Sequence, residues 1–124
     1  MFNVNRVTLL GNATRDAEVR ATKTGQQVTA LGLATTRAWK DAKGEMQREP
    51  EFHSLVCFGS LADFAGKRIA KGTPLYVEGH LHTNKWEKDG KPHSRTEILV
   101  DRLVLLSSKK GAAVAAVAEE AVAA

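Results

Sequence analysis

The run VTALGLATTRAW, residues 28–39, is followed by a charged connection, Lys40–Pro50, and then by EFHSLVCFG, residues 51–59. Both flanking runs are rich in β-branched and aromatic residues, and such runs on either side of a polar connection are typical of paired strands. The connection itself is expected to be a flexible loop. We therefore predict a long hairpin over residues 28–59, around which the rest of the chain is arranged.

Two phenylalanines of the second run are expected to share one face. Side chains alternate along a strand, so Phe52 and Phe58 point one way while Leu55 and Cys57 point the other. Because Leu55 and Cys57 already supply an inward face, we interpret the two rings as a surface for stacking bases. The alternative, that both rings are core residues, stays open.

Both tryptophans lie in polar surroundings, which is unusual for core residues. Trp39 and Trp86 each have charged neighbours within two positions along the chain. Alternation places Trp39 on the face of Leu31 and Leu33, so a β-bulge must intervene if those leucines are core and Trp39 is not. Gly32 lies inside this run and is a candidate for a bulge or bend.

The remaining segments alternate with turn residues, as in a small barrel. Strands are predicted at residues 4–10, 18–22, 74–86 and 94–106, and the first is expected to end at Gly11-Asn12. The Lys88-Asp89-Gly90-Lys91 stretch predicts a hairpin turn between the last two strands.

One helix is predicted, over residues 60–71. Its apolar residues recur near helical spacing, Ser60 is a candidate N-cap, and Gly72 is a candidate residue for its C-terminal end. An all-β order with one helix between the third and fourth strands is the plan of a five-stranded barrel, the oligonucleotide-binding fold. We predict an all-β protein, a β-barrel with one short helix, as a single domain over residues 1–107.

The composition changes after this domain. Residues 112–124 contain only Ala, Val and Glu, which cannot bury a core of their own. We expect residues 108–124 to be a short, Ala-rich, disordered tail.

Charge and cysteine content narrow the function classes. The net charge is +4 and the pI about 9.4, and the part up to Lys110 carries +6 because both acids of the tail lie beyond it. This mild excess favours a polyanionic partner. One cysteine permits no intrachain disulfide, and no secretory signal or membrane-spanning run is found. We expect a cytoplasmic, nucleoid-associated protein with no membrane partner.

Nothing in the sequence has the pattern of an active site. There is no Gly-rich phosphate loop, GxSxG or HExxH. His80 and His82 point the same way on a strand but lack a third ligand nearby, so a metal-dependent enzyme built on them is the weaker alternative. We predict no enzymatic activity, no metal and no cofactor.

Aromatic and basic residues together predict binding of single-stranded nucleic acid. Stacking a base on an aromatic ring contributes roughly 1–3 kcal/mol and does not depend on which base it is. Cations near the rings would follow the phosphates and make affinity fall with salt. The predicted stacking residues are Trp39, Phe52, Phe58 and Trp86, and the predicted phosphate contacts are Arg6, Arg15, Arg20, Arg37, Lys40, Lys71, Lys85 and Arg95.

Several short motifs in register resemble one family over about residues 1–107. They are VNRVTLLGN (4–12), DAEVR (16–20), the run from LAT (33–35) to Trp39, GEM (44–46), EFH (51–53), VCFG (56–59), KG (71–72), VEG (77–79) and KW (85–86). With these motifs the chain resembles the bacterial single-stranded DNA-binding proteins.

The resemblance implies a homotetramer of oligonucleotide-binding barrels with DNA wrapped over its surface. Trp39, Phe58 and Trp86 match family stacking positions, and Phe52 stands where the family often has Trp. Arg6, Lys71 and Lys85 match family basic positions. His53 matches a position at the subunit interface.

Departures from the family pattern are expected to matter. Ser54, Ser60, His82 and Asn84 stand where relatives often carry Arg or Lys, so we expect fewer phosphate contacts and a shallower salt dependence. The family's acidic, Pro-Phe-terminated tip has no match here, which argues against recruitment of replication enzymes by that route.

The sequence thus predicts a non-enzymatic protein that binds and protects single-stranded DNA in replication, recombination and repair. A dimeric barrel of the replication-restart type is the nearest alternative. An RNA-binding barrel is another, because stacking and phosphate contacts separate RNA from DNA only weakly.

Overall fold

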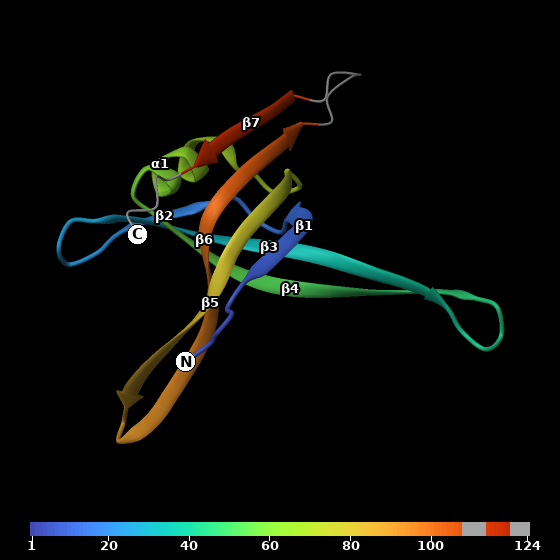
Figure 1. Ribbon diagram of the computed structural model, residues 1–124, viewed down its shortest axis with the longest axis horizontal. Coiled ribbons are helices and arrows are strands. Elements are labelled where there is room, and N and C mark those ends of the chain that lie inside the picture. The colour runs from blue at the N-terminus through green and yellow to red at the C-terminus, as the bar shows by residue number, and fades with distance from the viewer. Residues whose placement is uncertain (108–113, 120–124) are drawn as a thin grey trace.

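The computed structural model describes residues 1–107 and 114–119 (Figure 1). In chain order its elements are β1 (Val7–Ala13), β2 (Glu18–Ala21), β3 (Gln27–Lys40), β4 (Met46–Phe58), α1 (Gly59–Arg68), β5 (Pro74–Lys88), β6 (Lys91–Ser107) and β7 (Val114–Glu119).

The strands form a closed barrel. Neighbours follow the order β1-β5-β6-β4-β3-β2, and β1 also pairs with β3, which closes the ring. The pairings are antiparallel except for a short parallel contact of β4 with β6, where Leu55 lies opposite Ile98 and Val56 opposite Leu99. The predicted all-β barrel with one helix between the third and fourth barrel strands is confirmed.

The core lies inside the barrel and under α1. Leu31, Leu33, Leu55 and Leu103 come from three different strands, and each is at most 1% exposed. On the helix, Leu61, Ala62 and Ala65 are buried against these strands. Buried Thr29 donates its hydroxyl to the Ala62 carbonyl at 2.6 Å, which joins β3 to α1 without leaving a buried hydroxyl unsatisfied.

Barrel closure depends on Gly11. The prediction that the first strand ends at this residue is wrong. β1 begins at Val7 and continues through Gly11 and Asn12 to Ala13. A Cβ on Gly11 would lie 2.2 Å from the Ala34 carbonyl oxygen of β3. Glycine is needed here because the two backbones approach closely, and no turn is formed.

The predicted hairpin is longer and straighter than expected. β3 and β4 pair without interruption from Val28 opposite Phe58 to Lys40 opposite Met46, so only residues 41–45 form the loop, and not 40–50. This ladder contains no bulge. Gly32 instead accommodates the Thr14 side chain, because a Cβ there would lie 2.2 Å from its hydroxyl oxygen.

The helix begins and ends earlier than predicted. It runs from Gly59 to Arg68, and its N-cap is Phe58, whose side chain makes no capping hydrogen bond. The N-cap assignment of Ser60 is therefore wrong, because β4 leads straight into α1. Gly72 has a φ of +90° but lies in the turn beyond Ile69, the C-cap.

Two hairpins project from the barrel in different directions (Figure 1). We call residues 34–54 the β3–β4 arm and residues 81–96 the β5–β6 arm. Every residue of the β5–β6 arm is exposed. Its two-residue turn has Asp89 at φ +54° and Gly90 at φ +74°, which confirms the predicted Asp-Gly hairpin.

The C-terminal part contains a strand that the sequence does not predict. β7 pairs antiparallel with β6, with Val114 opposite Ser107 and Glu119 opposite Arg102. Residues 108–113 and 120–124 lie outside the described residues, so the disordered tail stays a prediction for them. Within the described ranges, α1 is too short and too polar to cross a bilayer, and no other helix is present.

Candidate nucleic-acid interface

Phe52 presents an apolar ring to solvent on the β3–β4 arm. Its side chain is 71% exposed, although phenylalanine is usually found inside proteins. It lies opposite Ala34, whose small side chain leaves the ring uncovered on that side of the ladder. An exposed ring on a two-stranded ribbon is available for stacking.

Trp39 lies on the other face of the same arm. It is opposite Gln47, and the uninterrupted ladder puts it on the face of Leu31 and Leu33, away from Phe52. Trp39 nevertheless escapes the core, because the arm has left the barrel by that point (Figure 1). A bulge is therefore not needed to explain its position.

Arg37 supports the Trp39 ring. The guanidinium carbon lies 4.6 Å from the centre of the ring, within the range of a cation–π contact. Arg37 lies opposite Glu49 in the ladder, and both residues belong to the β3–β4 arm. The guanidinium covers one face of the indole, so a base would stack on the other.

The tip of the β3–β4 arm is held by Asp41. One carboxylate oxygen accepts hydrogen bonds from the backbone N–H groups of Lys43 (2.9 Å) and Glu45 (3.0 Å), and the other accepts one from Gln47 (3.0 Å). The bond from Glu45, followed by those from Gln47 and Lys43, holds the pKa of Asp41 below its ordinary value of 3.8. Because Gln47 lies opposite Trp39, this loop also orders the end of the ladder beside the indole.

We expect the Asp41→Ala variant to loosen this tip. Loss of the acceptors should speed hydrogen exchange of the Lys43 and Glu45 amides, as measured by NMR, while Leu31 and Leu55 in the barrel keep their protection. The lowered pKa means that the charged form stabilises the loop. In the wild type this ordering should be complete above pH 3.8 and be lost as pH falls through the lower pKa.

Unchanged exchange at Lys43 and Glu45 in the variant would show that the turn forms without the carboxylate. The Asp41→Asn variant separates charge from hydrogen bonding, because an amide oxygen still accepts.

A continuous outer face connects the two arms. In the parallel contact Val56 lies beside Leu99, on the side of β4 opposite to Leu55 and Cys57, and alternation extends this side to Ser54 on β4 and Arg95 on β6. Arg95 Nη2 donates a hydrogen bond to Ser54 Oγ at 3.4 Å. Phe52, two residues from Ser54, therefore shares this face with the start of the β5–β6 arm.

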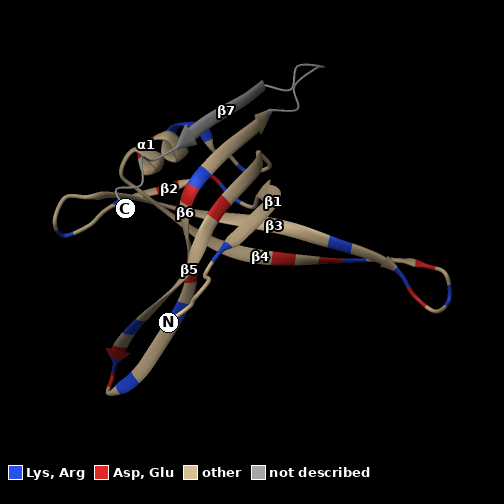
Figure 2. Ribbon diagram, viewed as in Figure 1, with Lys and Arg blue, Asp and Glu red and all other residues tan. Residues whose placement is uncertain are grey.

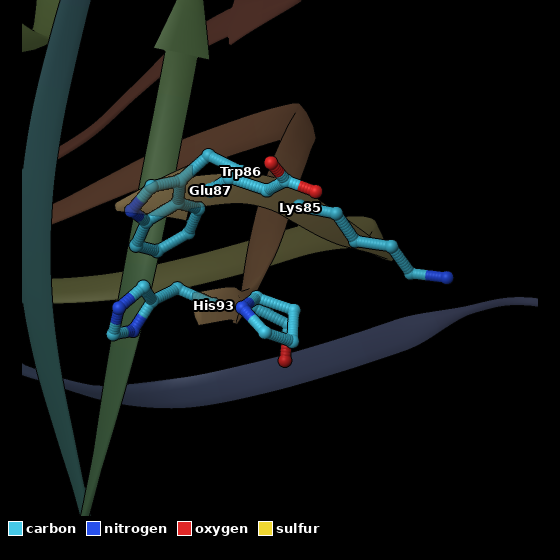
Figure 3. Close-up of a pocket in the computed structure, with 6 residues that line it drawn as sticks. Lys85, Trp86, Glu87 and His93 are labelled. Atoms are coloured by element: carbon cyan, nitrogen blue, oxygen red, sulfur yellow. The ribbon is translucent and has the colours of Figure 1, made fainter. Parts of the chain in front are cut away.

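Trp86 is the exposed ring of the β5–β6 arm. It is 45% exposed and stacks on His93 directly across the hairpin, with ring centres 5.8 Å apart and an angle of 19° between the planes. Figure 3 shows both rings on one side of the hairpin while Lys85 points away from them. The hollow around them measures about 510 Å³ and is also lined by Lys85, Glu87, Pro92 and Ser94.

Phe58 is the predicted stacking residue that lies outside both arms. It is half-buried at the end of β4, opposite Val28, where the chain enters α1. It shares the outward side of β4 with Phe52 but lies six positions along the strand, at the barrel. The four predicted rings therefore lie in three places, on two arms and on the barrel.

The predicted phosphate contacts divide into two groups. Arg6, Arg20 and Arg95 have carboxylate neighbours at 3.6, 2.8 and 3.9 Å, which reduce the net positive charge around each guanidinium. The Arg20 hydrogen bond and charge lower the pKa of its partner, Glu18. The others are exposed side chains: Arg15, Arg37, Lys40, Lys71 and Lys85. In Figure 2, Lys and Arg alternate with Asp and Glu on both arms.

The histidines have different surroundings. His53 Nε2 shares a hydrogen bond with Thr35 Oγ1 at 2.9 Å, on the face away from Phe52. His80 Nδ1 lies 3.0 Å from Asp101 Oδ2, and His82 Nε2 lies 3.0 Å from Asn84 Oδ1. In the part of the chain that the structure describes, no three His, Cys, Asp or Glu residues gather as metal ligands.

Sequence reasoning did not identify His93 or Asp41 as parts of this surface, and it did not predict the contact of Ser54 with Arg95. His93 could have been found by counting outward from the Asp89-Gly90 turn, because equal steps along the two strands reach Trp86 and His93. The contact of Ser54 with Arg95 has no such local signal, since it joins residues 41 positions apart.

Comparison with known proteins gives one consistent result. A family model described as the single-strand binding protein family matches residues 4–106. A structure described as Plasmodium falciparum SSB in complex with ssDNA is 28% identical over 86% of this chain and 98% of its own, with a TM-score of 0.76.

Two structures of the single-stranded DNA binding protein from Thermus aquaticus are each 30% identical over 86% of this chain. The wild-type protein has a TM-score of 0.73 and a deletion mutant one of 0.75. Only 52% of each Thermus chain is covered, so the present chain spans about half their length. The family match covers most of the chain, and the barrel agrees with it: this protein belongs to the single-strand binding protein family.

Proposed function

We propose that this protein binds single-stranded DNA with little sequence preference and acts as a binding protein, not as an enzyme. The observation that carries the proposal is the outer face, on which Phe52 and Trp86 are 71% and 45% exposed on two arms that Arg95 and Ser54 connect. Large exposed rings beside cations on a single barrel are suited to unpaired bases. The Plasmodium relative, whose structure contains ssDNA, supports the same ligand.

Binding combines two physical terms. Each base that stacks on a ring contributes roughly 1–3 kcal/mol in single-strand binding barrels of this kind, and every base offers a π-face. Exposed cations such as Lys40, Lys71 and Lys85 follow the phosphates and release counterions. Neither term depends on base identity, so the protein covers any open strand.

Use of both Trp39 and Phe52 requires the strand to pass around the β3–β4 arm. The two rings lie on opposite faces of the ribbon. Within the described residues, β4 pairs with β6 only at Leu55 and Val56, so the arm beyond them is a ribbon with no third strand. A flexible strand can therefore cross its edge, whereas a stiff duplex cannot bend on that scale.

Protection of exposed strands follows from this binding, in line with roles in replication, recombination and repair. A protein that binds only the open form of DNA shifts the equilibrium of a hairpin toward the open form by mass action. A nucleoid-associated, cytoplasmic location fits such a role.

We further propose assembly into a homotetramer, with His53 at a subunit contact. His53 is half-buried and lies on the face of β4 that does not carry Phe52, so a subunit contact there would leave the outer face accessible. Sedimentation analysis distinguishes a tetramer from the dimer expected of a replication-restart barrel.

Titration with oligo-dT at several salt concentrations tests the proposed ligand. We expect strong quenching of tryptophan fluorescence, because stacking changes the surroundings of Trp39 and Trp86. Affinity should fall with salt, with a slope of about −0.7 for each phosphate contact. Because Ser54, Ser60, His82 and Asn84 stand where relatives often carry Arg or Lys, the slope should be shallower than theirs.

Duplex DNA and oligo-rU of equal length serve as controls in the same titration. Equal affinity for duplex DNA, or no quenching by oligo-dT, would contradict the proposal. Tighter binding of oligo-rU would favour the RNA-binding alternative.

A further inference from the structure

We propose that His93 is a nucleotide-contacting residue: its imidazole extends the Trp86 ring into a two-ring site and, when protonated, supplies a positive charge to the DNA phosphate. The inference rests on the proposed binding of single-stranded DNA. It adds a residue to that interface and makes the affinity of this arm depend on pH.

The geometry of the pair leaves a surface for a nucleotide. Ring centres 5.8 Å apart at an angle of 19° describe an offset stack, since such stacks have centres about 4.5–7 Å apart. In an offset stack each ring extends past the edge of the other, so part of each ring face stays uncovered. Figure 3 shows the two rings projecting from the hairpin side by side, with neither enclosed by other labelled side chains.

The hollow beside the rings fits a nucleotide in size and chemistry. Its volume of about 510 Å³ falls within the range of about 300–1,000 Å³ typical of small-ligand sites. Trp86 and His93 provide flat ring walls on one side of the hairpin, and alternation places Lys85, Pro92 and Ser94, which also line the hollow, on the other side. Two flat ring walls suit a base, and the cations on the same side of the hairpin suit the phosphate that follows it.

The charges around His93 favour an anion. On the outer face, alternation places Lys91 and Arg95 on either side of His93 in β6 and Lys88 near it in β5. Glu87 lines the hollow from the other strand, and Glu97 lies farther along β6, where it contacts Arg95 and Asn84. The described residues that line the hollow all come from β5 and β6.

His93 differs from His80 and His82 in its partners. His80 shares a hydrogen bond with Asp101, and His82 with Asn84. Among the described residues no carboxylate forms an ion pair with His93, which stacks on the Trp86 ring. A phosphate that approaches the His93 imidazole therefore displaces no ion pair among the described residues.

The expected pH dependence follows from this arrangement. Histidine changes its charge between about pH 5 and pH 8, and a phosphate stabilises the charged form. Binding then takes up a proton at His93, so affinity rises as pH falls. The neutral ring still stacks, and part of its contribution therefore persists at high pH.

The test is oligo-dT affinity at about pH 8 and about pH 6, the range in which histidine titrates, for the wild type and three variants. We expect wild-type affinity to rise roughly fivefold at the lower pH. His93→Ala should lower affinity at both pH values and lose most of this rise. His93→Phe should retain affinity at high pH without the rise, and His93→Arg should retain high affinity at both.

The matched control is His80→Gln, which removes an imidazole of β5 that does not line the hollow. It should keep the wild-type pH profile. The inference is overturned if all His93 variants keep that profile, or if His80→Gln abolishes it. If the wild type binds no oligo-dT at either pH, the proposed function itself fails. Thermal melts check that each variant is folded, so that a difference in oligo-dT affinity reports on binding.

Discussion

Replacing Trp86 with alanine is expected to weaken binding of oligo-dT by roughly 5- to 150-fold, the loss of one base–aromatic stack. The same range is expected for Trp39→Ala. Neither variant should unfold more readily, because both rings lie on arms outside the barrel core, and Trp86 is 45% exposed. Each change also removes one contact within an arm, of Arg37 with Trp39 or of His93 with Trp86, and neither contact involves the barrel core.

Binding of these variants is best measured by fluorescence anisotropy of a labelled oligonucleotide, since each mutation removes an intrinsic fluorophore. Thr83→Ala is a matched control for Trp86: it lies three positions away in β5 and faces the other side of the hairpin, where it bonds Thr96. It should leave affinity nearly unchanged. Loss of cooperative melting in a Trp variant would instead show that the ring is part of the core.

Oligonucleotides of different lengths test whether the bound DNA contacts both faces of the β3–β4 arm. Trp39 and Phe52 lie on opposite faces, so a short oligonucleotide can reach only one of them. Trp39→Ala should therefore cost more affinity with a long oligonucleotide than with the shortest one that binds. An equal loss at every length would place the main DNA path on the Trp39 face alone.

Local patterns predicted the parts of the fold that depend on neighbouring residues. The Asp89-Gly90 pair predicted the β5–β6 hairpin, because a type I′ two-residue turn requires positive φ at both positions, which Asp and Gly adopt most readily. Alternation in β4 correctly separated buried Leu55 and Cys57 from exposed Phe52. These features follow from backbone geometry over a few residues.

Features that depend on distant segments could not be read from the sequence. Gly11 looked like a turn because its partner, Ala34 of β3, is 23 positions away and closes the barrel. Trp39 looked as if it needed a bulge because the sequence does not show where β3 leaves the barrel. The continuous outer face depends on the parallel contact of β4 with β6, and no local sequence pattern predicts this contact.

Leu33→Ala is expected to lower the free energy of unfolding by about 2–5 kcal/mol, the usual result of emptying a packed leucine site. Leu33 is fully buried, with 0% exposure, and it pairs with Ala13 at barrel closure and with His53 on β4. The cavity therefore lies where β1, β3 and β4 meet. Urea denaturation at several protein concentrations measures the loss and separates it from any change in assembly.

Phe52→Ala, on the strand that pairs with that of Leu33, is the matched control, and we expect it to affect binding and not stability. Its ring faces solvent, so unfolding should change by no more than about 0.5 kcal/mol, the usual limit for a surface site. Binding should show the reverse order: at low temperature, where it is still folded, Leu33→Ala should bind oligo-dT nearly as the wild type does, whereas Phe52→Ala should bind more weakly. If Leu33→Ala lost affinity while folded, the core would also position the arms. If Phe52→Ala lost stability, its ring would be packed against a second subunit and would not be available to DNA.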